Sequence, residues 1–86
     1  MKLKIFIKTD CPNCPAAKEV GKQLESKGAN IEWFDLDNED GLSEAAYFDV
    51  LSTPSLIVID EDDNEVKAWR GDVPEIEILQ KELQIK

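Results

Sequence analysis

Two cysteines, Cys11 and Cys14, are the residues of this chain whose types and spacing could do chemistry. Pro12 and Asn13 separate them, and the pair follows the short apolar run 5–7. At the start of a helix, unpaired backbone N–H groups and the positive end of the helix dipole stabilise a thiolate, the form of cysteine that attacks disulfides. Two sulfurs at this spacing can also close a small disulfide ring. The pair therefore predicts dithiol–disulfide exchange, with Cys11 at the open end of a helix as the nucleophile and Cys14, one turn further in, as the resolving cysteine.

Metal binding is the main alternative for such a pair. Two thiolates supply half of a tetrahedral zinc site, so a metal carrier or iron–sulfur carrier would need a second copy or outside ligands. The chain has no histidine, the commonest further ligand. Copper carriers place the same motif after a first strand, but they usually have a methionine two residues before the first cysteine, where this chain has Thr9. We expect no metal in the site, and a redox sensor without turnover is a third alternative.

Length and charge narrow the function further. A chain of 86 residues predicts one domain, residues 1–86. Residues 1–30 carry six basic and three acidic residues, whereas residues 31–86 carry four basic and sixteen acidic ones, for a net charge of −9. This acidic balance argues against binding to nucleic acid or to an anionic membrane. No apolar stretch approaches the roughly 20 residues of a membrane span, and the apolar start is too short for a signal peptide. We expect a cytoplasmic monomer, in a compartment where thiols are normally reduced.

Hydrophobic patterns predict seven elements. Four segments rich in apolar and β-branched residues are expected to be strands, the last two joined by an acidic turn: 3–8, 31–36, 56–59 and 65–69. Three segments with apolar residues at helical spacing are expected to be helices: 12–27, 42–48 and a last one from residue 72. The first strand–helix–strand unit predicts two parallel strands, and the hairpin supplies an antiparallel pair.

The helix ends have their own sequence signals. Pro12 suits the first helical position, because a proline has no N–H to lose there, and Gly28 suits the C-terminal stop. Gly21 lies inside the first helix, where we expect it to allow close packing of the helix backbone on the sheet. Asp72 is expected to cap the last helix, with Glu75 three residues later as the partner in a capping box.

Two further helix features follow from the same patterns. The second helix is expected to bury Leu42, Ala45 and Ala46, and Asp49 is expected to end it in a left-handed conformation. The last helix is expected to carry an apolar stripe formed by Val73, Ile76, Leu79 and Leu83.

The element order β-α-β-α-β-β-α, with a C-x-x-C after the first strand and a proline before the third, resembles the small glutaredoxin-like members of the thioredoxin superfamily. Four separated segments carry the resemblance: 7–14, 50–56, the apolar strand with its hairpin, and 69–74. The resemblance implies an α/β thioredoxin-like fold, in which three helices flank a four-stranded mixed sheet. It also implies that the Thr53–Pro54 bond is cis, the minority form of X–Pro bonds.

Four residues around the cysteines are expected to tune the thiols rather than to react. Pro12 and Asn13 set the geometry of the ring and the start of the helix. Lys8 matches a lysine that glutaredoxins and NrdH-redoxins often carry, and its ammonium would stabilise a Cys11 thiolate. Asp10 acts in the opposite direction, because a neighbouring negative charge raises the pKa of a thiol. An ordinary solvent-exposed role stays open for both charged residues.

A second group is expected to bind the substrate. With a cis Thr53–Pro54 bond, the N–H and C=O of Thr53 would face outward and pair with an extended substrate as an added strand. The proline would also keep metals from bridging the thiolates. Gly71 and Asp72 are expected to act first as turn and cap residues and second as substrate contacts. Trp69 is expected to pack in the core or hairpin.

The resemblance implies no bound cofactor and leaves two electron sources. Glutaredoxins typically hold glutathione with a tyrosine where this chain has Asn13, and with a Gly-Gly-x-Asp segment of which Gly71-Asp72 remains. The spacing Trp69-x-Gly71-x-x-Pro74 is similar to that of NrdH-redoxins, which thioredoxin reductase reduces and which serve ribonucleotide reductase. We therefore expect a flavoprotein disulfide reductase of the thioredoxin reductase type, rather than glutathione, as the reductant. Protein disulfides, with that of ribonucleotide reductase as a candidate, are the expected substrates.

Overall fold

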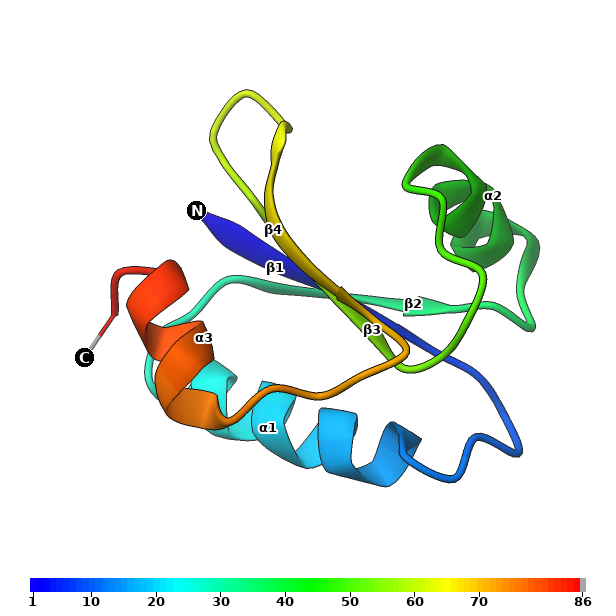
Figure 1. The fold of residues 1–86 in the computed structure, drawn as a ribbon, viewed down its shortest axis with the longest axis horizontal. Helices are drawn as coiled ribbons and strands as arrows, with labels where there is room; N and C mark the ends of the chain where they lie inside the picture. The colour runs from blue at the N-terminus through cyan, green and yellow to red at the C-terminus, as the bar shows by residue number, and fades with distance from the viewer. Residues whose placement is uncertain (86) are drawn as a thin grey trace.

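The computed structural model describes residues 1–85, which form a four-stranded mixed sheet with helices on both faces (Figure 1). Along the chain the elements are β1 (Lys2–Ile7), α1 (Cys14–Ser26), β2 (Ile31–Asp35), α2 (Glu39–Tyr47), β3 (Ser55–Ile59), β4 (Glu65–Arg70) and α3 (Ile76–Glu82). The strand order is β2-β1-β3-β4, with β1 parallel to β2 and the other pairs antiparallel. The predicted element order and sheet type are confirmed, with strand ends that differ by one residue. No helix within residues 1–85 is long and apolar enough to cross a bilayer.

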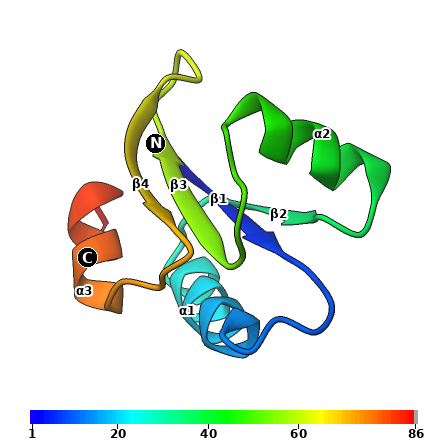
Figure 2. The same ribbon diagram turned by 45° about the vertical axis from the view of Figure 1, so that its right-hand side comes forward.

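The two central strands, β1 and β3, are buried on both faces, since α1 and α3 cover one face of the sheet and α2 covers the other (Figure 2). Alternate residues of β1 serve the two sides: Leu3 and Ile5 pack under α1 and α3, whereas Phe6 packs under α2. The whole of β3 is buried for the same reason. This double covering fixes the register of the central strands, because a slip by one residue would move every side chain to the wrong layer.

Gly21 allows α1 to lie close to the sheet, as predicted. A Cβ built on Gly21 would lie 2.7 Å from Cδ1 of Ile5 and would also run into the indole ring of Trp33. The predicted helix stops are confirmed as well: Gly28 follows α1 with φ +90°, and Asp49 follows α2 with φ +56°.

The buried face of α2 differs from the prediction. The helix begins at Glu39, and Gly41 packs against the β2 backbone so closely that an added Cβ would lie 2.6 Å from the carbonyl carbon of Asp35. Because of this contact, the residues at positions i, i+4 and i+7 face the sheet: Gly41, Ala45 and Phe48. The prediction was right for Ala45 and wrong for Leu42, which is 57% exposed, and for Ala46, which is also exposed.

The last helix starts later than predicted, at Ile76 instead of Asp72. A proline disfavours the helical conformation at the residue before it, and Val73 precedes Pro74. Asp72 therefore caps no helix; its Oδ1 accepts a hydrogen bond from the Val73 N–H at 2.8 Å. Glu75 takes the N-cap position with no side-chain cap bond, so the predicted capping box is absent. The predicted apolar stripe nevertheless packs into the core.

Lys4 is a buried cation on the α2 side of the sheet, with an exposed fraction of 7%. Its Nζ donates to Oε1 of Glu32 at 2.9 Å and to Oε1 of Glu44 at 2.7 Å, which joins β1 to both β2 and α2. The same ammonium lies 4.8 Å and 5.5 Å from the ring centres of Phe34 and Phe48. Burial lowers the pKa of Lys4, but the hydrogen bonds to the two carboxylates outweigh it and hold that pKa above its usual value.

Candidate active site

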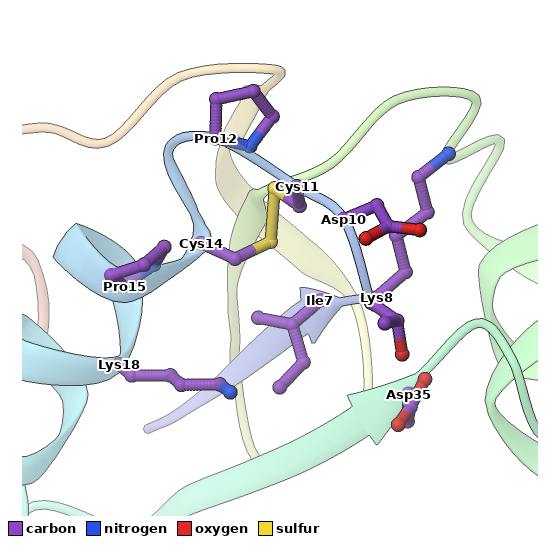
Figure 3. Close-up of a pocket in the computed structure, with 10 residues that line it drawn as sticks. Ile7, Lys8, Asp10, Cys11, Pro12, Cys14, Pro15, Lys18 and Asp35 are labelled. Atoms are coloured by element: carbon purple, nitrogen blue, oxygen red, sulfur yellow. A yellow bond between two sulfur atoms is a disulfide. The ribbon is translucent and has the colours of Figure 1, made fainter.

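A disulfide joins Cys11 to Cys14 in the turn between β1 and α1 (Figure 3). Their Cα atoms lie 5.3 Å apart, and the Cys14 N–H donates to the Cys11 carbonyl at 3.3 Å. The exposed fraction is 9% for Cys11 and 2% for Cys14. Cys11 is thus the more accessible of the two residues, which favours the predicted roles of nucleophile and resolving cysteine.

The helix behind the disulfide begins at Cys14, two residues later than predicted. A helix starting at Pro12 would need an N–H at position 15 to donate to the Cys11 carbonyl, and Pro15 has none. The Cys14 N–H takes that carbonyl instead, and the first helical bond runs from Ala17 N–H to the Asn13 carbonyl at 3.3 Å. Pro15, in the first turn, is therefore the helix-starting proline, and Pro12 belongs to the turn before it.

A hollow of about 620 Å³ opens beside the disulfide. It brings together three predicted site residues, Lys8, Asp10 and Pro12, with both cysteines. Its other lining residues include Lys18 of α1 and Asp35 at the end of β2, neither of which the sequence analysis singled out. Both had a signal. Lys18 lies four residues after Cys14, on the same helix face, and Asp35 ends the strand that runs parallel to β1.

Asp37 ties down the loop that carries Cys11. Its Oδ2 accepts the Thr9 N–H at 2.8 Å, across 28 residues of sequence. Hydrogen bonds from the backbone and side chain of Thr9 hold the pKa of Asp37 below its usual value, and the charge of Lys8 acts in the same direction. Asp10 follows in the left-handed region, with φ +61°. The effects of Lys8 and Asp10 on the Cys11 thiol stay predictions.

The predicted substrate-binding residues gather at the same edge of the sheet as the disulfide. The Thr53–Pro54 bond is cis, as the resemblance implied, and Pro54 is buried immediately before β3. Since β1 and β3 are antiparallel, the end of β1 that leads to Cys11 lies beside the start of β3. The Gly71 N–H donates to the Pro54 carbonyl at 2.9 Å, with Gly71 at φ +81°.

A smaller hollow, about 270 Å³, joins two further predicted residues. Asn13 and Asp72 line it together with Ala16 and Val73. The two halves of the predicted site, the turn at the cysteines and the segment after β4, therefore meet in space. Trp69 is half-buried and packs against the core on the α1 side, as predicted.

Metal ligation has no further support in the described part of the chain. Within residues 1–85, no group of three or more histidine, cysteine, aspartate or glutamate side chains is placed to hold a metal ion.

Known proteins match this chain in both sequence pattern and fold. The sequence model of a thioredoxin domain matches residues 1–84. Thioredoxin 1 from Thermosipho africanus has a similar structure, with a TM-score of 0.67 and 20% identity over 98% of this chain and 91% of its own. A thioredoxin from Thermus thermophilus has a TM-score of 0.66 and 21% identity over 95% and 70%. A variant of a thioredoxin-like protein has a TM-score of 0.60 and 27% identity over 95% and 99%. No curated protein sequence matched.

Proposed function

The chain belongs to the thioredoxin-domain family, and on that premise we propose that it is a dithiol–disulfide oxidoreductase that reduces protein disulfides. The observation that carries the proposal is the Cys11–Cys14 disulfide at the junction of β1 and α1. The positive end of α1 faces the turn that holds both sulfurs, which favours a thiolate once the disulfide is reduced.

The proposed reaction starts from the reduced protein. The Cys11 thiolate attacks one sulfur of the substrate disulfide; a new S–S bond forms to Cys11, the substrate S–S bond breaks, and the other substrate sulfur leaves as a thiolate. Cys14 then loses its proton and attacks the Cys11 sulfur, which releases the second substrate thiolate. Two electrons pass to the substrate, both of its sulfurs take up protons, and the Cys11–Cys14 disulfide is left. An external dithiol or flavoprotein reductant must then restore the dithiol.

Substrate backbone binding is assigned to Thr53 in this proposal. The Pro54 carbonyl is already occupied by the Gly71 N–H. Within residues 1–85, neither the N–H nor the C=O of Thr53 forms a backbone–backbone hydrogen bond. An extended peptide could therefore add to Thr53 as a short strand beside the sulfurs. Gly71 and Asp72, next to it, would contact the same peptide.

Trapping experiments test the assignment of the two sulfurs. We expect the Cys14→Ser variant to form a stable mixed disulfide with an oxidised protein substrate such as insulin, because nothing remains to resolve it. The Cys11→Ser variant is the matched control and should form none. In the reduced wild-type protein, limiting iodoacetamide near neutral pH should label Cys11 first, as peptide mass spectrometry would show. Trapping through Cys14, or preferential labelling of Cys14, would overturn the mechanism.

We propose a flavoprotein of the thioredoxin reductase type as the electron source. Two observations support it: the family match is to a thioredoxin domain, and Asn13 stands where glutaredoxins use a tyrosine for glutathione. Asn13 and Asp72 face a common hollow, so a tripeptide there would meet an amide and a carboxylate. Reduction of a disulfide in ribonucleotide reductase, in the reducing cytoplasm, is the candidate role.

The reductant can be identified by offering the oxidised protein either NADPH with thioredoxin reductase or glutathione with its own reductase. We expect the flavoprotein to reduce the Cys11–Cys14 disulfide much faster. Efficient, saturable reduction by glutathione would contradict this choice of reductant, while leaving the dithiol mechanism intact.

A further inference from the structure

A second groove adjoins the disulfide hollow. Four residues line it, and we call it the lysine groove: Ile7, Lys18, Lys22 and Trp33, around about 320 Å³. Ile7 and Lys18 also line the disulfide hollow, so the two hollows adjoin at these residues. Figure 3 shows the Lys18 side chain running from α1 toward Ile7, beneath the disulfide. A segment that lies in the lysine groove can therefore extend into the hollow lined by the two cysteines.

The floor of the lysine groove is apolar and held in place. Trp33 comes from β2 and packs against the core, and its ring lies directly over Gly21. The indole Nε1–H donates to Oε2 of Glu25 at 3.0 Å, which fixes the ring at its outer edge. Ile7, at the end of β1, is also only partly buried. A partner side chain that covered this floor would find it already ordered, so little conformational entropy would be lost in the groove itself.

The walls of the lysine groove are cationic in a molecule of net charge −9. Lys18 and Lys22 lie four residues apart on α1 and so project from the same helix face. Both are exposed, and within residues 1–85 neither forms an ion pair. Among the described residues, no carboxylate lines the lysine groove itself, and Glu25, at its edge, is engaged by Trp33. Asp10 and Asp35 line the adjoining disulfide hollow, where Asp35 accepts the Asp37 N–H at 2.9 Å.

We propose that the lysine groove docks an acidic segment of a protein substrate, adjacent to the substrate's disulfide and carrying an apolar side chain. The apolar group covers Ile7 and Trp33, and the carboxylates pair with Lys18 and Lys22. The inference rests on the proposed function, because it names the kind of disulfide that the same sulfurs reduce. Complementary charge beside a reacting group raises the rate of productive encounter and falls off with salt.

Disulfide peptides that differ only in their flanks test this docking. Three peptides would carry acidic, neutral or basic residues beside one cystine, and the second-order rate of their reduction by the pre-reduced protein would be measured at low and high salt. Two exposed ion pairs predict that the acidic peptide reacts about threefold to tenfold faster than the neutral one, and that high salt removes the difference.

Charge variants locate the effect on the surface. The Lys18→Glu, Lys22→Glu double variant should lose or reverse the preference for the acidic peptide. The Lys18→Gln, Lys22→Gln double variant removes the two charges without reversing them, so it tests the same point should the double-Glu variant disturb α1, and it should lose the preference. The matched control reverses Lys67 and Lys81, which lie on β4 and α3, outside the groove, and it should keep the preference. An equal preference in both double-Glu variants, or none in the wild-type protein, overturns the inference. If the neutral peptide is not reduced at all, the proposed function fails instead.

Discussion

Replacing Lys4 by methionine tests how a buried cation holds the α2 layer onto the sheet. Methionine keeps the length and apolar stem of lysine but removes the ammonium, and with it two charge-assisted hydrogen bonds to Glu32 and Glu44. A hydrogen bond to a charged group stabilises a protein by about 1.5–3 kcal/mol. The two carboxylate side chains are 39% and 31% exposed, so water can hydrate them once the ammonium is gone. We therefore expect a loss of about 3 kcal/mol in the free energy of unfolding, the low end of the sum for two such bonds.

Urea unfolding at neutral pH measures this loss, and Lys2→Met is the matched control. Lys2 reaches the same Glu32 at 3.7 Å with a 30% exposed side chain, and exposed pairs contribute about 0–1 kcal/mol. If Lys4→Met and Lys2→Met lose the same stability, or if Lys4→Met loses none, the account of Lys4 as a structural cation is wrong.

Acid provides an internal check on the same variant. The hydrogen bond from Lys4 is the main cause that holds the pKa of Glu32 below the usual value of 4.5. A carboxylate with a lowered folded-state pKa contributes stability above its unfolded pKa and loses it as the pH falls through the folded one. The wild-type advantage over Lys4→Met should therefore shrink progressively below about pH 4.5. At the alkaline end it should shrink only above pH 10.5, because the pKa of Lys4 is raised in the folded state.

Two further substitutions test the packing of α1 and the tether of the active-site loop. Gly21→Ala should destabilise the protein by about 1–3 kcal/mol in urea unfolding, because the new methyl group meets Trp33 and Ile5. This overpacking outweighs the helix propensity that alanine gains over glycine. An increase in stability would refute the close contact. Asp37→Ala should speed hydrogen exchange of the Thr9 amide at neutral pH, because alanine has no acceptor for that N–H. In the wild-type protein the same amide should lose protection as the pH falls below about 3.8, because the lowered pKa of Asp37 keeps the carboxylate ionised down to that range. Unchanged Thr9 exchange in Asp37→Ala would show that the loop is held elsewhere.

Local chemistry accounts for the starts of two helices, α1 and α3. Pro15 stands four residues after Cys11, and Pro74 stands directly after Val73, so the sequence itself disfavours helices that begin at Pro12 and at Asp72. The later starts follow from a missing N–H and a steric clash, both of which act within a few residues. The predicted start at Pro12 rested on the fit of that proline to the first helical position, and the start at Asp72 rested on a capping box with Glu75.

The sequence by itself determined the order of the elements, the sheet they form, and the pairing of Cys11 and Cys14 at the end of the first strand, because alternation, helical spacing and a short ring are local properties. Only the tertiary structure decided which partners meet across long stretches of chain: Lys4 with Glu44 over 40 residues, and Thr9 with Asp37 over 28. The chain carries nineteen acidic residues, and nothing local tells a lysine or an amide which of them it will meet. These partners are set when β1, β2 and α2 pack together. The register of the strands and the close contact of Gly41 with β2 decide which carboxylates come within hydrogen-bonding distance.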